Sequence, residues 1–192
     1  QGYARMLERW GKDDRAILEE SISAINKEAK NMQDLVEKLL FIARNDKDTM
    51  VLIKNEFDMS ELMRELVRDT EMLNTEHKVE SLIKPGIKVF GDPDRIKQAL
   101  RIFVDNAIKY TEKGGTITIR LEEEDKYAVA VIKDTGIGIP ENELPNIFDR
   151  FYRIDASRER NKGGHGLGLS IARIIVLRHG GRIKIRAMES PS

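Results

Sequence analysis

Residues 134–140 read DTGIGIP, and residues 163–170 read GGHGLGLS. In the first segment a carboxylate, Asp134, directly precedes glycines that allow a ligand to approach the backbone closely. The second segment leads into the apolar-periodic run SIARIIVLRHG, which predicts a helix ending at Gly180. The N-terminus of such a helix offers unpaired N–H groups and a positive dipole end to a phosphate chain. Together the two segments indicate a nucleotide bound between a carboxylate and an anion cradle.

A third segment, DPDRIKQALRIFVDNAIKYT at residues 92–111, has the pattern of an amphipathic helix. Asp92 is a candidate N-cap and Pro93 a candidate first helical residue. Its apolar positions recur at helical spacing and comprise Ile96, Leu100, Phe103, Val104 and Ala107. A helix is therefore expected upstream of both glycine segments.

The end of this helix carries three side chains suited to a magnesium nucleotide. Asn106, Lys109 and Tyr110 are three or four residues apart and so lie on adjacent parts of the helix. The amide oxygen of Asn106 can bind Mg²⁺, the charge of Lys109 can meet phosphate, and the ring of Tyr110 can face a base. Each residue alone is also typical of a solvated helix face. Their distances from the two glycine segments favour one shared site.

Other phosphate loops do not fit this chain. The sequence has no GxxxxGK[ST] segment, and no GxGxxG lies between a strand and a helix. A glycine segment alone would be a weak indicator, since flexible turns have the same composition.

The chain resembles part of a bacterial two-component sensor histidine kinase, namely its catalytic and ATP-binding domain with part of the preceding dimerisation domain. Four sequence boxes of that family occur here in the same order. DNAIKYT resembles the N box, DTGIGIP the first glycine box, FDRFYR at 148–153 the F box, and GGHGLGLS the second glycine box. The resemblance covers nearly the whole chain. It implies a Bergerat-type ATP-binding fold, shared with gyrase, Hsp90 and MutL, and the cofactors ATP and Mg²⁺.

The resemblance also implies roles for single residues. Asn106 would bind the metal, Lys109 would contact phosphate, and Arg153 would meet the γ-phosphate; these three are the candidate catalytic residues. Tyr110 would lie near adenine or ribose, and Asp134 would accept from the adenine amino group. The remaining candidate nucleotide-binding residues are Gly136, Gly138, Ile139, Gly164, His165, Gly166, Leu167 and Gly168.

The implied activity is transfer of the γ-phosphoryl group of Mg-ATP to a histidine and onward to a response-regulator aspartate. Two features depart from the family pattern. Ile102 stands where the N box often has a second polar residue, one turn before Asn106. The family's H box with the acceptor histidine would precede QGYARMLE, so this chain is not expected to phosphorylate itself. His77 and His179 are interpreted as structural or surface residues.

Three alternatives remain from the sequence. The first is an ATPase-type relative, although Ile102 cannot activate water as a glutamate would. The second is an anti-sigma serine kinase, which shares the fold but normally lacks a dimerisation hairpin. The third is a dimerising interaction module with a vestigial nucleotide site.

Residues 1–46 are interpreted as a truncated helical hairpin for dimerisation. From residue 15 to residue 45, apolar side chains alternate by four and three as in a coiled-coil seam. These positions are Leu18, Ile22, Ile25, Ala29, Met32, Val36, Leu39 and Ala43. Such a seam needs a partner helix, so a homodimer is expected.

Residues 47–192 are expected to form the globular domain, an α+β two-layer sandwich with three helices on a mixed sheet. The segments expected as strands are VLIKNEF, KVESLI, IKVFG, TITIRLEE, YAVAVIKD and RIKIRA. Asp58 and Glu61 predict the start of a helix running to about residue 75. Residues 140–165 are interpreted as a lid over the nucleotide, because long charged loops are usually functional or disordered.

Composition narrows the function classes. The chain has 33 basic and 33 acidic residues, so no net charge points to nucleic acid or a membrane surface. The absence of cysteine excludes disulfides and thiolate metal sites. With no apolar run of membrane-spanning length, a cytoplasmic location is expected, with a parent protein that could be membrane-anchored.

Overall fold

The computed structural model describes residues 5–6, 15–154 and 165–186. The chain divides into two compact units, Gln1–Met50 and Val51–Ser192. No helix in these described ranges is long and apolar enough to cross a membrane.

The first unit is dominated by one long helix, α2 (Arg15–Asp46), which confirms the helix predicted from residue 15 to residue 45. Most of its heptad side chains are solvent-exposed: Ile22, Ile25, Met32, Val36 and Leu39, with the adjacent Leu40. The first arm of the truncated hairpin expected from the sequence, residues 1–14, lies outside the described residues except for residues 5 and 6, which are helical.

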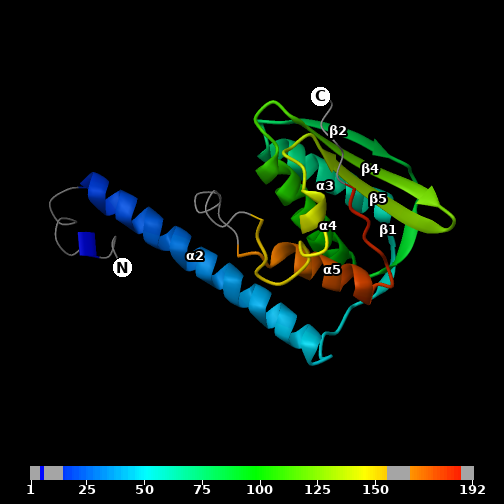
Figure 1. The fold of residues 1–192 in the computed structure, drawn as a ribbon, viewed down its shortest axis with the longest axis horizontal. Helices are drawn as coiled ribbons and strands as arrows, with labels where there is room; N and C mark the ends of the chain where they lie inside the picture. The colour runs from blue at the N-terminus through cyan, green and yellow to red at the C-terminus, as the bar shows by residue number, and fades with distance from the viewer. Residues whose placement is uncertain (1–4, 7–14, 155–164, 187–192) are drawn as a thin grey trace. The chain divides into compact units, whose positions relative to one another are not determined.

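The second unit contains a mixed three-stranded sheet and a two-stranded ribbon (Figure 1). In the sheet, β2 (Lys78–Ile83) runs parallel to β4 (Thr116–Glu124), and β5 (Tyr127–Asp134) pairs antiparallel with β4. The ribbon joins β1 (Asn55–Asp58) to β3 (Lys88–Gly91). Side chains alternate along β4, so Ile117, Ile119 and Leu121 are fully buried on the face toward the helices.

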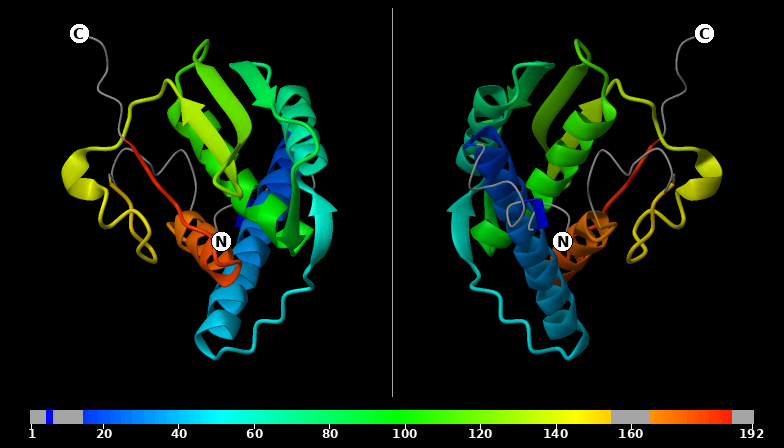
Figure 2. Two further views of the ribbon diagram at one scale, coloured as in Figure 1. Left: turned by 90° about the vertical axis from the view of Figure 1, so that its right-hand side faces the viewer. Right: turned by 90° about the vertical axis from the view of Figure 1, so that its left-hand side faces the viewer.

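Two helices cover this face and a third lies beside them. Helices α3 (Met59–Leu73) and α4 (Pro93–Tyr110) pack on the strands, and α5 (Gly168–Arg178) packs against α4 (Figures 1 and 2). Met63, Leu66 and Val104 supply the fully buried centre of the helix layer. The α+β two-layer architecture expected from the sequence is thus confirmed.

Both predicted N-caps are present. Asp58 Oδ1 accepts from Glu61 N at 3.0 Å, and Asp92 Oδ1 accepts from Arg95 N at 3.1 Å. Each carboxylate satisfies a backbone donor that the first helical turn leaves unpaired. The helix starts at residues 59 and 93 therefore follow from local sequence.

Two strand predictions were wrong in part. RIKIRA was expected as a strand, but its described residues 182–186 form none. Their burial alternates as in a strand, yet a ladder also needs a neighbouring backbone in register. VLIKNEF was expected as a strand from residue 51, but β1 begins at Asn55. The backbone N–H of Ile53 is instead bound by a side chain, Asp92 Oδ2, at 2.9 Å.

Candidate nucleotide-binding site

The first glycine segment is fixed to the end of α4. Ile137 N donates to Tyr110 O at 3.3 Å. Gly136 lies so close to this turn that an added Cβ would be 2.9 Å from the Tyr110 carbonyl carbon and 2.8 Å from Asp134 Oδ1. Only glycine fits this close approach. The structure thus brings Asp134 and Gly136 next to the helical turn that carries Lys109 and Tyr110.

Asp134 ends β5 and is exposed. Its Oδ1 accepts from Gly136 N at 2.8 Å, which fixes the orientation of the carboxylate. Within the described part of the chain, the structure gives its second oxygen no partner. A carboxylate held in this way by one oxygen can accept from a ligand amino group with the other.

Thr135 ties the same segment to the sheet, a role that sequence reasoning missed. Its Oγ1 accepts from Thr116 N at 2.9 Å, and its own N donates to Thr116 O at 3.1 Å. The sequence DTG could have indicated this role, because the threonine hydroxyl often forms hydrogen bonds to nearby backbone groups in turns.

Lys109 and Tyr110 form one polar group at the C-terminal end of α4. Lys109 Nζ donates to the Tyr110 hydroxyl at 3.0 Å and lies 4.7 Å from the centre of its ring. Both side chains are partly exposed. An ammonium over an aromatic face is a stabilising arrangement that also holds the charge near the ring.

The second glycine segment meets α4 one turn before Asn106. A Cβ on Gly168 would lie 3.3 Å from Ile102 Cγ2. Ile102 and Asn106 are four residues apart and share a helix face, so Asn106 is presented toward the start of α5. The Ile102 side chain thus makes an apolar contact with Gly168 at the position where the N box often has a second polar residue.

The start of α5 is open to an anion. Its N-cap, Leu167, is buried and makes no side-chain capping bond, and Gly166 before it has φ +68°. The first-turn N–H groups therefore keep unpaired donor capacity at the positive end of the helix dipole. This is the local structure expected of a phosphate-binding segment.

The F-box segment is bound to the second glycine segment. Phe151 N donates to Gly166 O at 2.9 Å, and Phe151 itself has φ +65°. A hydrogen bond between the Tyr152 hydroxyl and Glu143 closes this loop, and the Arg173 guanidinium lies 5.6 Å from the ring centre of Phe148. Arg153, the next residue after Tyr152, is thereby brought near the start of α5.

Three of the remaining candidates lie in described residues, and a fourth does not. Gly138, with φ +70°, and Ile139 continue the first glycine segment, and His165 is exposed just before Gly166. Gly164 and residues 155–164 of the expected lid lie outside the described residues.

The other two histidines have internal partners. His77 Nδ1 is 2.8 Å from Asn74 Oδ1, and its Nε2 is 3.0 Å from Thr111 O. His179 Nε2 accepts from Asp92 N at 3.0 Å, so its Nδ1 carries the proton that it donates to Ile175 O at 2.7 Å. These bonds agree with a structural role for both.

Asn106 is the one residue proposed from the sequence as a metal ligand. Within the described ranges, no three His, Cys, Asp or Glu side chains gather as a metal site. Asn106 offers one neutral oxygen, which fits Mg²⁺ because this ion usually takes few protein ligands together with phosphate and water.

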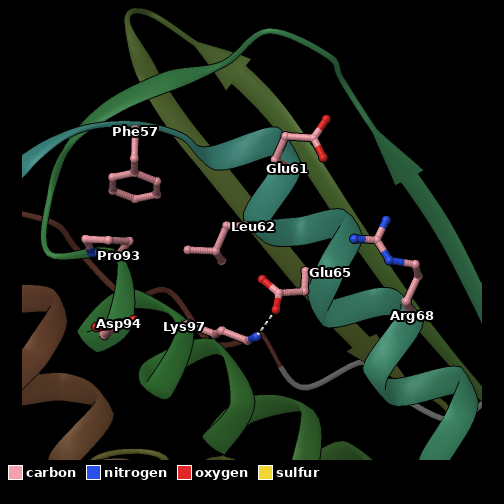
Figure 3. Close-up of a pocket in the computed structure, with 8 residues that line it drawn as sticks. All are labelled: Phe57, Glu61, Leu62, Glu65, Arg68, Pro93, Asp94 and Lys97. Carbon is pink, nitrogen blue, oxygen red and sulfur yellow. Dashed lines mark ion pairs between the residues drawn. The ribbon is translucent and has the colours of Figure 1, made fainter.

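A separate hollow of about 250 Å³ lies at the opposite end of α4 (Figure 3). It is lined by Phe57, Glu61, Leu62, Glu65, Arg68, Pro93, Asp94 and Lys97. Lys97 Nζ crosses from α4 to Glu65 Oε1 at 2.7 Å and Asp69 Oδ2 at 3.4 Å. None of the candidate nucleotide-binding residues lines this hollow.

Fold and site together define a nucleotide-binding domain of the ATPase type, and comparison with known proteins agrees. The family model of histidine kinase-, DNA gyrase B- and HSP90-like ATPases matches residues 91–191, and the chain belongs to this family. ATP is the nucleotide that this family implies.

Within the family, the similarity is to sensor histidine kinases. The chain is 37% identical over 188 residues to the signal transduction histidine-protein kinase ArlS of Staphylococcus aureus (strain USA300), covering 97% of this chain. It spans 42% of the length of that relative. The mycobacterial sensor histidine kinase MprB is 32% identical with a TM-score of 0.58, over 67% of this chain and 81% of that one. The resemblance predicted from the sequence boxes is confirmed.

A third comparison concerns the fold alone. The Acinetobacter baumannii histidine kinase AdeS matches with a TM-score of 0.68 at 23% identity, over 92% of this chain and 81% of that one.

Proposed function

We propose that this chain is the ATP-binding catalytic part of a sensor histidine kinase, which transfers the γ-phosphoryl group of Mg-ATP to a histidine. The observation that carries the proposal is the convergence of the two glycine segments on the C-terminal half of α4. Gly136 and Ile137 contact Tyr110, and Gly168 packs at Ile102. Between these two contacts α4 presents Asn106 and Lys109.

The adenine end lies at the first glycine segment. The free oxygen of Asp134 accepts from the adenine amino group, and Gly136, Gly138 and Ile139 line the base. Tyr110 lies near the base or the ribose. The hydrogen bond from Gly136 N supports this role, because it holds the carboxylate before the ligand arrives.

The phosphate end lies at the start of α5. Backbone donors of residues 164–168, His165 among them, meet the phosphate oxygens, and Lys109 and Arg153 add positive charge. Asn106 would hold Mg²⁺, which neutralises phosphate charge when bound. The uncapped first turn of α5 supports this assignment.

The acceptor is an imidazole rather than water. A hydrolytic relative needs a base one turn before the asparagine, and here Ile102 packs against Gly168 at that position. The phosphoryl group then passes to an aspartate of a response regulator. Positioning and electrostatic stabilisation are sufficient for such a transfer.

Helix α2 provides the dimer contact. Its exposed side chains Ile22, Ile25, Met32, Val36 and Leu39 follow the heptad spacing along one face. Burial of this face against a second copy would remove apolar surface from water, which favours a homodimer.

The decisive experiment measures ADP and ATP binding in magnesium buffer by titration calorimetry. Wild-type chain should bind both, and Asp134→Ala should reduce affinity by at least about 100-fold, because the hydrogen bond from the adenine amino group loses its acceptor. Asp125→Ala, in the turn between β4 and β5, is the matched control and should bind as wild type. Equal affinity of the Asp134 variant and the wild type would overturn the proposed site.

A further inference from the structure

Residues 51–54, here called the connecting segment, join the helical unit to β1. Two of its three apolar side chains are largely exposed, Val51 at 81% and Ile53 at 77%, and only Leu52 is partly buried. Polar contacts therefore contribute to holding this segment.

Two hydrogen bonds attach the connecting segment to the domain. Ile53 N donates to Asp92 Oδ2 at 2.9 Å, and Lys54 Nζ donates to Arg178 O at 2.9 Å. The first bond reaches the start of α4, and the second reaches the last residue of α5.

Asp92 is the centre of this attachment. Its Oδ1 caps α4 through Arg95 N, its Oδ2 holds Ile53 N, and its own N donates to His179 Nε2. The residue is only 6% exposed. Burial acts to raise the pKa of this carboxyl, but the hydrogen bonds from the backbone N–H groups of Ile53 and Arg95 and the positive charge of Arg95 bring the pKa below its usual value. The group therefore keeps its charge at neutral pH.

The attachment lies at the far ends of the two helices that carry the candidate site. His179, after α5, meets Gly91 and Asp92 before α4, whereas Gly168, at the start of α5, meets Ile102. Helices α4 and α5 thus run antiparallel, with the candidate nucleotide residues at one end of the pair and the connecting segment at the other.

We propose that Asp92 is a positioning residue that fixes the connecting segment to the α4–α5 pair and so restricts the orientations of the domain relative to helix α2. The Ile53–Asp92 bond acts as a latch at the junction between the two units. The consequence for catalysis rests on the proposed function, because transfer to a histidine requires the domain to reach it. The latch itself is independent of nucleotide.

Asp92→Asn separates the two roles of this side chain. Asparagine is as good an N-cap as aspartate, so its amide oxygen can still serve Arg95 N. Its other terminal atom is an NH₂ group, which cannot accept from Ile53 N. Asp58→Asn is the matched control, because Asp58 caps α3 through Glu61 N and holds no connecting segment.

Hydrogen exchange on the whole chain gives the first readout. In Asp92→Asn the Ile53 amide should exchange about tenfold faster, as expected for the loss of one hydrogen bond to a charged acceptor, while the amides of α4 keep their protection. Asp58→Asn should leave Ile53 unchanged. Unaltered exchange at Ile53 in the Asp92 variant would overturn the latch.

Distances between spin labels give the second readout, which a purely structural role would not change. The chain has no cysteine, so Glu28→Cys in α2 and Lys133→Cys in β5 provide unique labelling sites. The distance distribution should broaden in Asp92→Asn and, to a smaller extent, in Lys54→Met, but not in Asp58→Asn. Equal widths in all four backgrounds would refute the proposal. Neither readout uses nucleotide, so failure here is distinct from failure of the proposed function.

Discussion

The two glycine segments of the site are held in different ways. The first, residues 134–138, is bound by regular secondary structure: Tyr110 O at the end of α4 receives Ile137 N, and Thr135 bonds both backbone groups of Thr116 in the sheet. The second, residues 163–170, is bound by a loop. Gly166 O accepts a hydrogen bond from the N–H of Phe151, a loop residue that is 60% exposed.

This difference indicates a division of labour within the proposed site. The segment assigned to adenine is bound to a helix and a strand, and the segment assigned to phosphate is bound to an exposed loop outside the regular secondary structure. A ligand whose base is constant and whose phosphate chain changes during the reaction suits such a site, because only the phosphate end must rearrange. Substitutions in the two segments should therefore have effects of different size and kind.

The largest effect is expected for Gly136→Ala. Its Cβ would lie 2.9 Å from the Tyr110 carbonyl carbon and 2.8 Å from Asp134 Oδ1, and neither neighbour can move without shifting α4 or β5. We expect a loss of roughly 3 kcal/mol in the free energy of unfolding, measured by urea denaturation. ADP affinity should fall by about 100-fold, because the clash displaces the Asp134 carboxylate from the position in which it would accept from adenine.

Gly138→Ala is the control for this variant. Gly138 has φ +70° but no atom within 4 Å of an added Cβ. The cost should be only about 1 kcal/mol, from the backbone conformation alone. If both variants lost the same stability, the contact with α4 would not be what fixes the first segment.

Gly166→Ala should have a smaller and more selective effect. The residue combines φ +68° with a Cβ position 2.7 Å from the Phe151 carbonyl carbon, yet that neighbour belongs to a loop that can yield. A loss of about 1–2 kcal/mol in unfolding free energy is expected. Calorimetry should show a greater loss of affinity for ATP than for ADP. A loss of ADP affinity as large as that of Gly136→Ala would show that the two segments are equally rigid.

Local signals explain which parts of the fold could be predicted from the sequence. The start of α4 followed from Asp92 and Pro93, and the hairpin of β4 and β5 from alternation on both sides of a turn, because these features are set by neighbours in sequence. The predictions of a strand at residues 182–187 and at the first residues of VLIKNEF were wrong because strand formation there is not set by neighbours in sequence. Whether their backbone groups enter a ladder depends on partners that are distant in sequence.

The same limit applies to the candidate site. The residue types of the site could be predicted from glycines, a carboxylate and an amide at suitable spacing. The bond from Ile137 N to Tyr110 O and the packing of Ile102 on Gly168 could not, since they arise only when α4, β5 and α5 are assembled. The sequence therefore predicts the chemistry of the proposed site, and the structure adds the contacts that hold each half of it.

The smallest effect is expected for Thr135→Val, which tests the sheet contact of the first segment alone. The substitution keeps the shape of the side chain but removes the oxygen that accepts from Thr116 N at 2.9 Å. Water can replace this partner at an exposed site, so the unfolding free energy should fall by only about 0.5–1 kcal/mol. ADP affinity should fall about twofold to threefold, because the orientation of Asp134 is less restricted. Thr118→Val, two residues further along β4, is the matched control and should bind ADP as the wild type does. If Thr135→Val bound ADP as tightly as this control, the rigidity of the first segment would come from α4 alone, and the sheet would contribute nothing to the adenine end of the site.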